Sequence, residues 1–389
     1  MTSMIDRNTL VKLCRDLIQS PSINPPAETA GCAEIMVEFF NKNDIRTEIV
    51  EGRSGAVNIV ARMAGQADGS RLLLNGHLDV VPPGPGWSVD PFGAELKDGR
   101  IYGRGAVDMK SGLAAMAMAM VTLKKSGFPF AGEIIFTGVA DEETGSRWGT
   151  RHLLDMGLIE AVDYAVVAEP TYLKVMPGNR GLRWLDITIS GRAAHAGRPH
   201  LGINAVSLAA KLVQSIEMLQ FTESNNAFEI PRPTMAVTMI QGGRQANIVP
   251  DSCCLTMDRR MIPGETAHSV ISEVEALIRP LVEAEGGAVI NVQARPDYWD
   301  PFLLSNDEPI VKLMVESVAE VTGRPVTILG KGACTDASHL FNRAGIPTVI
   351  FGPGDERLAH QVDEWVGITD LVQAAETYFH LMKKVLRPT

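Results

Sequence analysis

The sequence has few cysteines, and they form no recognisable metal or disulfide motif. Five occur in 389 residues, none of them in a C-x-x-C pair: Cys14, Cys32, Cys253, Cys254 and Cys334. An odd, scattered set of this kind indicates a reducing compartment in which the thiols are small core residues. We therefore expect a cytoplasmic protein.

The sequence also lacks a segment that would hold the chain at a membrane, and it has no excess of positive charge. The longest run of small apolar residues, 112–123, is too short to span a bilayer and predicts a buried helix. Residues 1–9 contain charges and no apolar core of a secretory signal. The net charge of -10 argues against nucleic-acid and anionic-membrane partners. It does not exclude an anionic substrate, because a site can be basic on an acidic protein.

What is present is the composition of an ordinary globular protein, with 45% hydrophobic and 21% charged residues. Its length exceeds one typical domain. Non-alternating apolar runs at 72–74, 134–139 and 164–168 are typical of strands covered on both faces, and a helical stretch at 110–125 separates the first two. This order predicts a doubly wound α/β sheet.

The pattern changes near residue 180. Residues 185–190 alternate apolar and polar side chains, which predicts a strand with one wet face. Helices over 206–216 and 270–281 and strands at 234–240, 254–260 and 288–292 follow. The order β-α-β-β-α-β is the ferredoxin-like arrangement. We therefore predict a domain of residues 180–293 inserted into a first domain made of 1–179 and 294–389.

Acidic and imidazole side chains follow the predicted strands of the first domain. His77 and Asp79 follow the run 72–74, Glu142 and Glu143 follow 134–139, and Glu169 follows 164–168. Ligands of open α/β sheets lie beyond the carboxyl ends of the strands, so these groups should meet. Each one alone is more typical of a helix cap or a solvated loop, but three successive strand ends favour a metal site.

Two further residues extend this set. Asp108 lies just before the helical stretch, and His360 lies shortly after a strand expected at 348–351. Histidine nitrogens favour zinc, and a carboxylate can bridge two ions. In His77-x-Asp79 the two side chains share a face of an extended segment, so Asp79 could hold the far imidazole nitrogen.

Five segments resemble the signatures of the acetylornithine deacetylase / succinyl-diaminopimelate desuccinylase / glutamate carboxypeptidase family of dinuclear zinc metallohydrolases. They are GHLDVVP (76–82), YGRGAVDMKSG (102–112), DEETG (141–145), AEPT (168–171) and HQVDE (360–364). The resemblance covers nearly the whole chain. It implies a zinc-peptidase-like catalytic domain with an inserted ferredoxin-like lid, or dimerisation, domain.

The resemblance also implies roles for the acidic and imidazole residues. Two divalent ions per subunit are expected, with zinc favoured over cobalt or manganese. Asp108 would bridge them, His77 and Glu169 would complete one ligand set, and Glu143 and His360 the other. Asp79 would orient His77. Glu142 would be the general base that takes a proton from the activated water and passes it to the leaving amine.

Further residues correspond to substrate positions of the family. His195 lies where relatives place a histidine that reaches the partner subunit's active site and donates to the oxyanion; its alternative is a solvated turn histidine. Asn247 and Arg260 resemble substrate-holding positions, with Arg259 as the neighbouring alternative because period-2 alternation lets only one of them face the site. The loops with Thr335 and Gly354 resemble loops that close the pocket.

The expected function is metal-dependent hydrolysis of the amide bond of an N-acyl amino acid, of the deacetylase or desuccinylase type. The alternative is a carboxypeptidase or dipeptidase of the same family acting on a short peptide, and a more remote one is a non-catalytic metal-binding protein. A nucleotide-dependent oxidoreductase is disfavoured, because the motif Gly103-x-Gly105 lacks its third glycine. An open strand edge of the lid predicts a homodimer.

Overall fold

The computed structural model describes residues 4–53 and 55–387, which divide into two compact units. Unit 1 comprises the described residues up to Asn179, together with Leu303–Lys331 and the residues from Thr335 onward. Unit 2 comprises Arg180–Phe302 and Gly332–Cys334. The second unit is therefore an insertion into the first.

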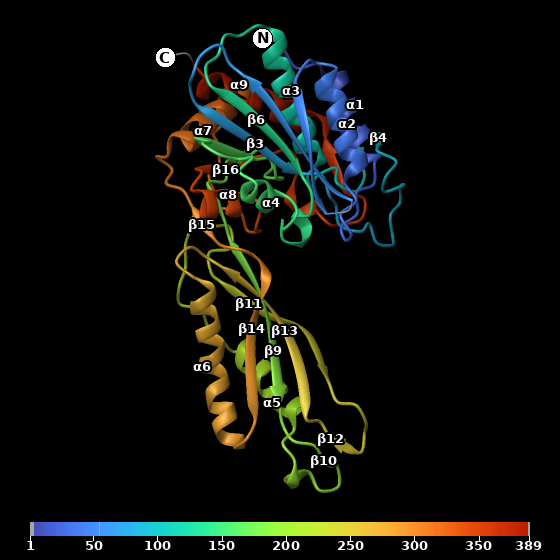
Figure 1. The fold of residues 1–389 in the computed structure, drawn as a ribbon, viewed down its shortest axis with the longest axis vertical. Helices are drawn as coiled ribbons and strands as arrows, with labels where there is room; N and C mark the ends of the chain where they lie inside the picture. Colours follow the sequence, from blue (N-terminus) through green and yellow to red (C-terminus); the bar gives the residue numbers. More distant parts are fainter. Residues whose placement is uncertain (1–3, 54, 388–389) are drawn as a thin grey trace. The chain divides into compact units, whose positions relative to one another are not determined.

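Unit 1 is built on a central sheet that is mostly parallel (Figure 1). Its strand order is β1 (Arg46–Arg53), β2 (Ala56–Ala64), β6 (Glu133–Val139), β3 (Arg71–His77), β7 (Tyr164–Val167) and β16 (Thr348–Ile350). β6, β3, β7 and β16 run parallel, whereas β1 and β2 form an antiparallel edge hairpin. The predicted α/β class is confirmed. The hairpin was not predicted, because β1 is largely exposed and lacks a continuous apolar run.

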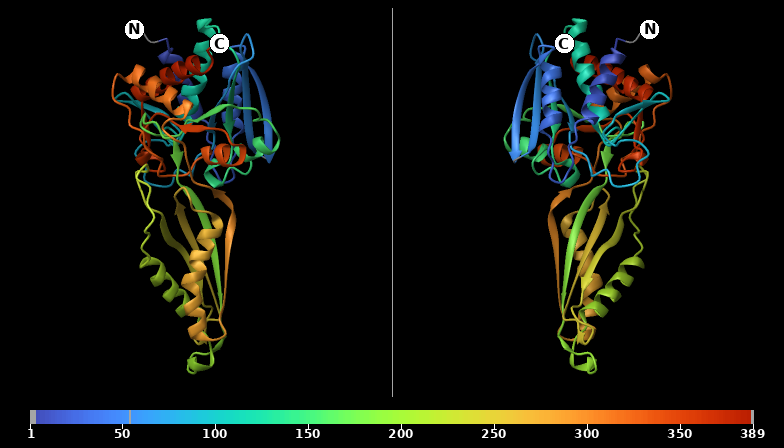
Figure 2. Two further views of the ribbon diagram at one scale, coloured as in Figure 1. Left: turned by 90° about the vertical axis from the view of Figure 1, so that its left-hand side faces the viewer. Right: turned by 90° about the vertical axis from the view of Figure 1, so that its right-hand side faces the viewer.

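Helices cover both faces of this sheet (Figure 2). They are α1 (Arg7–Ile18), α2 (Ala30–Asn41), α3 (Lys110–Ser126), α4 (Thr150–Asp155), α7 (Pro309–Thr322), α8 (Ala337–Ala344) and α9 (Ile368–Val385). A Cβ added at Gly76 would lie 3.0 Å from Leu113, so that side of β3 packs on α3. The side chain of Asn75, on the other side of β3, donates to Thr150 of α4 at 3.0 Å.

The helices form as the spacing of their apolar residues predicts. In α1 the buried positions are Leu10, Leu13, Cys14, Leu17 and Ile18, three or four residues apart on one face. The α3 segment consists largely of Ala, Met and Leu and is buried on nearly every side. Among the described residues, no helix combines the length and the apolarity needed to cross a bilayer.

A small sheet also belongs to unit 1. Its order is β17 (Trp365–Gly367), β5 (Arg100–Tyr102) and β4 (Glu95–Lys97). β17 pairs antiparallel with β5, so that Trp365 lies opposite Tyr102. This pairing brings the segment after His360 next to the segment that leads to Asp108. Short elements elsewhere in the chain are η1 (Glu142–Thr144), β8 (Gly178–Asn179), η2 (Pro199–Leu201), β15 (Phe302–Leu303) and η3 (Glu356–Leu358).

Unit 2 has the predicted β-α-β-β-α-β order. Its main elements are β9 (Gly181–Ser190), α5 (Ala205–Glu217), β11 (Thr234–Gly242), β13 (Ser252–Met261), α6 (Ala267–Glu285) and β14 (Val289–Trp299), with the short strands β10 (Ala194–His195) and β12 (Ile248–Val249). The sheet order β11-β13-β9-β14 is ferredoxin-like. Leu185, Ile187 and Ile189 of β9 are buried in the core that includes residues of α5 and α6, while Thr188 and Ser190 are exposed.

Candidate metal centre

Two groups of potential ligands occur among the described residues, and they share one member. The first group is His77, Asp108 and Glu169; the second is Asp108, Glu143 and His360. Within each group the potential ligand atoms lie within 4.8 Å of one another. Asp108 belongs to both, which is the arrangement that a carboxylate bridging two ions requires.

The two carboxylate oxygens of Asp108 face different histidines. Oδ1 lies 3.0 Å from Nε2 of His77, and Oδ2 lies 3.4 Å from Nε2 of His360. Nε2 of His77 is also 3.5 Å from Oε1 of Glu169, and Nε2 of His360 is 3.2 Å from Oε1 of Glu143. The predicted set of five ligands is therefore gathered at one place in unit 1.

The topology of the sheet explains why these residues meet. His77 is the last residue of β3, η1 with Glu143 follows β6, and Glu169 follows β7. β6, β3 and β7 are parallel neighbours, so their carboxyl ends lie at the same edge. Asp108 comes just before α3, and His360 follows η3 with a left-handed backbone (φ 63°).

Asp79 contacts both His77 and the loop after β6. Nδ1 of His77 lies 2.9 Å from the main-chain oxygen of Asp79, which can only accept, so Nδ1 carries the proton and Nε2 faces the carboxylates. The Asp79 carboxylate is 3.7 Å from Nδ1. It accepts hydrogen bonds from the main-chain N–H groups of Glu142 and Glu143, each at 3.2 Å, and from Asn24 at 2.8 Å. The contact expected of the Asp79 side chain is thus made mainly by its carbonyl group.

Crowding of carboxylates in a buried place shifts the pKa values of this cluster. Burial and the charge of Asp108 raise the pKa of Glu169 to about 8. Hydrogen bonds to Asp108 and Glu143 raise the pKa of His360 to about 10. Burial lowers the pKa of His77, but the hydrogen bond to Asp108 and the surrounding carboxylates raise it well above its usual value. The cluster thus holds protons that a divalent cation would replace, and its nitrogen and carboxylate donors fit such a cation.

Glu142 lies beside this cluster but belongs to neither ligand group. Only 7% of its surface is exposed, and burial raises its pKa well above the usual range, with further contributions from Glu169 and Asp336. A carboxylate with a raised pKa can hold a proton near neutral pH, which is the property of a general base that later acts as an acid.

Two buried charged residues near the cluster were not predicted from the sequence. Asp336 accepts hydrogen bonds from the hydroxyls of Ser146 and Thr150, and burial raises its pKa to about 6. Nζ of Lys331 donates to the carbonyl of Pro170 at 2.9 Å and to Glu356 at 2.6 Å. Asp336 follows Thr335 in a segment for which the family resemblance implies only a loop that closes the pocket, and no sequence signal distinguishes Lys331.

The two loop residues predicted in unit 1 have different surroundings. Thr335 is buried, and its hydroxyl donates to Asn179 at 3.2 Å. Gly354 has φ 83°, and a Cβ added there would lie 3.2 Å from the Val107 side chain, next to Asp108 in sequence. Gly354 therefore lies beside the segment that contains Val107 and Asp108. A glycine suits this position because it tolerates the positive φ and leaves room for the Val107 side chain.

The residues predicted in unit 2 lie at two ends of its sheet. His195 pairs with Ile248, and the carbonyl of Asn247 accepts from Ala196 at 2.9 Å, so His195 and Asn247 are neighbours, and both are exposed. The β10–β12 pair lies beyond the end of β13 at Ser252, whereas Arg260 is eight residues from Ser252 towards the other end, about 27 Å at the usual rise per residue. This separation is much longer than an N-acyl amino acid.

The structure distinguishes Arg259 from Arg260. Arg259 is buried on the helix side of the sheet, forms ion pairs with Glu265 and Glu273, and lies 4.1 Å from the ring centre of Phe221. Arg260 is on the other face, is one-third exposed, and forms an ion pair with Asp258 at 2.9 Å. Of the two, Arg260 has the more accessible guanidinium.

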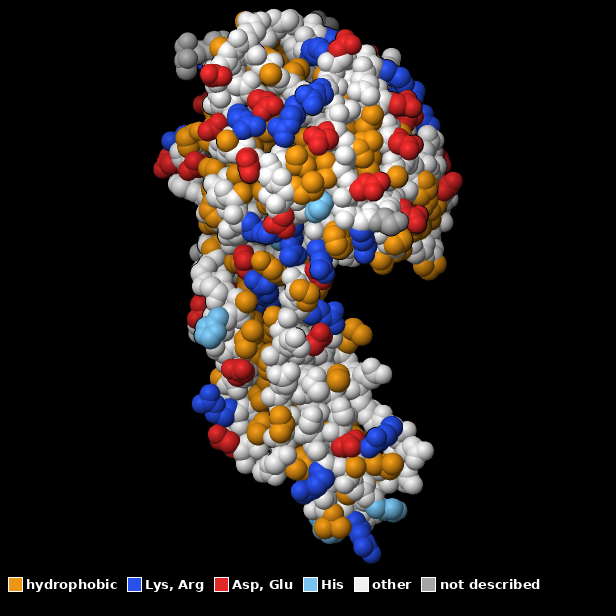
Figure 3. All heavy atoms as spheres, viewed as in Figure 1, with side chains coloured by type: hydrophobic (Ala, Val, Ile, Leu, Met, Phe, Trp, Pro, Cys, Tyr) orange, Lys and Arg blue, Asp and Glu red, His pale blue; other side chains and the backbone are white. Residues whose placement is uncertain are grey.

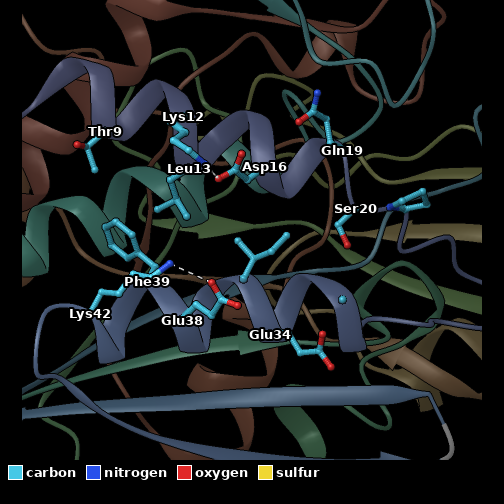
Figure 4. A pocket seen from close by; sticks show the side chains of 13 residues that line it. Thr9, Lys12, Leu13, Asp16, Gln19, Ser20, Glu34, Glu38, Phe39 and Lys42 are labelled. Carbon is cyan, nitrogen blue, oxygen red and sulfur yellow. Dashed lines mark hydrogen bonds and ion pairs between the residues drawn. The ribbon is translucent and has the colours of Figure 1, made fainter.

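A pocket of about 800 Å³ lies between α1 and α2 (Figure 4). Lys12 pairs with Asp16 and Lys42 pairs with Glu38 on its exposed walls. The half-buried side chains of Ile35 and Phe39 also line it. None of the residues of the two ligand groups lines this pocket, and its two lysines are paired with acidic side chains of its own walls, so the candidate site is the cluster around Asp108.

The chain is similar to known metallopeptidases and deacylases over nearly its whole length. The profile of peptidase family M20/M25/M40 matches residues 73–384. Succinyl-diaminopimelate desuccinylase of Wolinella succinogenes is 32% identical over 381 residues, which cover 95% of this chain and 97% of that protein. N-formyl-4-amino-5-aminomethyl-2-methylpyrimidine deformylase of Halalkalibacterium halodurans is 29% identical over 405 residues, covering 96% and 94%.

Among solved structures, a tripeptidase from Staphylococcus aureus superposes with a TM-score of 0.81 at 26% sequence identity, covering 99% of this chain and 100% of that one. The family resemblance inferred from the five sequence segments is thereby confirmed. The chain belongs to peptidase family M20/M25/M40.

Proposed function

We propose that this protein hydrolyses the amide bond of an N-acyl amino acid, with two divalent metal ions at the Asp108 cluster and Glu142 as general base. The observation that carries the proposal is the position of Asp108 in both ligand groups, with the buried Glu142 beside them. That the protein is an amide hydrolase accords with its family and with relatives named for desuccinylation and deformylation.

His77 and Glu169 would hold one ion, Glu143 and His360 the other, and Asp108 both. Such ions, when bound, acidify water and polarise the scissile carbonyl group. Zinc fits the mixture of imidazole and carboxylate donors, and cobalt or manganese could replace it. The hydrogen bond between His77 and Asp79 keeps the Nε2 lone pair of the neutral imidazole directed at the cluster.

Glu142 would accept a proton from the attacking water and donate it to the leaving amine. Burial raises the pKa of the Glu142 carboxylate above its usual range, which favours the protonated form that would donate to the leaving amine. Its backbone is fixed by the hydrogen bond from its N–H group to Asp79, so the carboxylate is presented from a rigid turn. Of the two neighbouring glutamates, the one outside the ligand groups therefore takes the proton, and Glu143 binds metal.

The second candidate is a carboxypeptidase or dipeptidase of the family that releases a C-terminal amino acid. The similarity to a tripeptidase favours hydrolysis of a peptide bond. Both reactions require the same cluster, and they differ in the group that flanks the scissile bond. Asn247, Arg260, Thr335 and Gly354 are the residues that we propose contact or enclose the substrate. The guanidinium of Arg260 would bind a carboxylate of the substrate.

We further propose that unit 2, predicted from the sequence as residues 180–293, acts as a lid and dimerisation domain of a cytoplasmic homodimer. β11 is at the edge of its sheet, and Met239 (64% exposed) and Ile240 (56% exposed) lie on it. Figure 3 shows further apolar side chains among the charged ones on the visible face of unit 2. An uncovered apolar edge favours pairing with a second copy. In such a dimer His195 and Asn247 would serve the partner subunit's active site, because they lie far along the sheet from Arg260.

The decisive experiment is a substrate panel. The zinc-loaded protein would be assayed with N-succinyl, N-formyl and N-acetyl amino acids and with di- and tripeptides, with Glu142→Gln as the control for contaminating activity. We expect release of the free amine from at least one N-acyl amino acid. Peptides as the only substrates would support the peptidase, and fully metal-loaded protein without activity on any of them would contradict the proposed function.

A further inference from the structure

We propose that Glu364 is a positioning residue for Asp108 and that Arg104 is its counter-ion. This proposal rests on the proposed metal-binding role of Asp108. Both residues belong to segments that resemble family signatures, YGRGAVDMKSG and HQVDE, but neither belongs to a ligand group. Their roles follow from the contacts of the Glu364 carboxylate.

The fold brings Glu364 to the segment that precedes Asp108. Trp365 of β17 lies opposite Tyr102 of β5, and the N–H group of Gly103 donates to the carbonyl of Glu364 at 2.9 Å. The Glu364 side chain is fully buried, with no exposed surface. Its carboxylate is therefore enclosed beside the backbone of residues 103–108.

The two oxygens of this carboxylate divide their contacts. Oε1 accepts hydrogen bonds from the main-chain N–H groups of Val107 at 2.7 Å and Asp108 at 3.1 Å. Oε2 accepts from Nη1 of Arg104 at 2.5 Å. One buried carboxylate thus holds the backbone of the proposed bridging ligand and is neutralised by a cation from the same segment.

Arg104 extends the connection to the second histidine. Its Nη2 lies 3.3 Å from the carbonyl oxygen of His360 and 3.4 Å from that of Pro83. Only 2% of Arg104 is exposed, so these contacts are made away from solvent. The pair therefore links the main chain of Asp108 to that of His360, although the two residues are far apart in the sequence.

This link controls the orientation of the Asp108 side chain. To bridge two ions, the carboxylate must present one oxygen to each ligand group, as it does at 3.0 Å from His77 and 3.4 Å from His360. A rotation of the Asp108 backbone would move both carboxylate oxygens together and would therefore weaken the binding of both ions. Contacts that orient metal ligands in this way typically change metal affinity about 10–100-fold when they are lost.

The buried ion pair of Arg104 and Glu364 could stabilise the fold without affecting metal binding. A variant must therefore distinguish an effect on stability from an effect on the metal ligands. Glu364→Gln keeps the shape but places an NH₂ group against either Arg104 or the two backbone donors, because an amide has only one acceptor oxygen. Glu133→Gln is the matched control. Glu133 accepts from Arg71 at 2.7 Å at the start of β6, at the opposite end of the same sheet from the cluster.

The test is metal binding in the absence of substrate, with the full chain. Zinc affinity would be measured by competition with a chromophoric chelator, and the coordination geometry by the visible spectrum of the cobalt-substituted protein. We expect Glu364→Gln to bind both ions roughly 10–100-fold more weakly and with an altered cobalt spectrum. Glu133→Gln should bind as the wild type does.

If Glu364→Gln does not fold, Arg104→Lys provides the second variant. It keeps the buried positive charge, but a lysine cannot bond to Glu364 and to the carbonyl of His360 with the planar fork of an arginine. We expect Arg104→Lys to lower the affinity for both ions to the same extent as Glu364→Gln. Wild-type affinity and spectrum in either folded variant would overturn the proposal. Failure of the wild type to bind two ions would instead overturn the proposed function.

Discussion

The carboxylate of Asp79 accepts a hydrogen bond of 3.2 Å from the main-chain N–H group of Glu142. The main-chain carbonyl oxygen of Asp79 accepts a second hydrogen bond, from Nδ1 of His77. One buried aspartate thus fixes a proposed metal ligand and the proposed general base relative to each other. Such fixed geometry supports the separate roles that we propose for the two adjacent glutamates, Glu142 and Glu143.

Glu142→Gln should abolish most of the turnover and leave the metal content unchanged. The amide keeps the shape of the side chain but cannot accept the proton, and general bases typically contribute about 10²–10⁴-fold to the rate. The measurement is kcat together with metal analysis of the same preparation. Glu143→Gln is the control and should lose metal. Near-wild-type kcat in Glu142→Gln would exclude this residue as the base.

Metal binding should saturate at two ions per chain. Asp108 is shared between the two ligand groups, so Asp108→Asn should lower the affinity for both ions. Glu169→Gln should lower the affinity only for the ion held with His77. Elemental analysis after exhaustive exchange gives the stoichiometry, and chelator competition gives the affinities. Reproducible saturation at one ion in the wild type would show that Asp108 is not a bridge.

The metal-free protein should become less stable as the pH rises from 7 to 10. The pKa of His360 is raised from 6.5 to about 10 by its hydrogen bonds to Asp108 and Glu143, and burial raises that of Glu169 from 4.5 to about 8. In this range the folded state holds protons that the unfolded chain has released, so this stabilisation is lost as the pH passes through the raised values. Urea midpoints of chelator-treated protein would show the decrease; a constant or rising midpoint would contradict it.

The same protons should be released when metal binds. Both imidazoles must give up a proton to present a lone pair, so metal affinity should rise with pH across this range. Calorimetric titration with zinc in two buffers of different ionisation enthalpy measures the number of protons released per ion. Identical heats in the two buffers would indicate that the cluster is already deprotonated at the pH of the experiment.

Mixing two inactive variants should restore activity if His195 acts on the partner subunit's active site. A dimer of about twice 42.0 kDa that contains one His195→Ala chain and one Glu142→Gln chain would hold one site with both an intact base and an intact histidine donor. Activity after subunit exchange, with light scattering for the mass, is the measurement. Demonstrated exchange without recovered activity would place the action of His195 within its own chain or exclude it.

Several features were predictable because they depend on local sequence. The buried face of α1 follows from apolar residues three and four positions apart, and the strands of unit 1 follow from apolar runs that a two-sided burial requires. The predicted ligands His77, Glu143 and Glu169 could be placed together because parallel strands end at one edge of the sheet. The roles within the cluster came from the resemblance of five segments to a known family.

By itself, the sequence determined the strands β3, β6 and β7 of unit 1, the element order of unit 2, and which chemical groups meet at the carboxyl ends of those three strands. Only the tertiary structure decided how those groups are held. Alternation along β13 shows that Arg259 and Arg260 face opposite sides, but ion pairs with Glu265, in the loop before α6, and with Glu273 of α6 decide that Arg259 is the buried one. The contact of Glu364 with Asp108 likewise depends on the pairing of β17 with β5. Periodicity is a property of neighbours in the chain, whereas these contacts join residues that only the folded chain brings together.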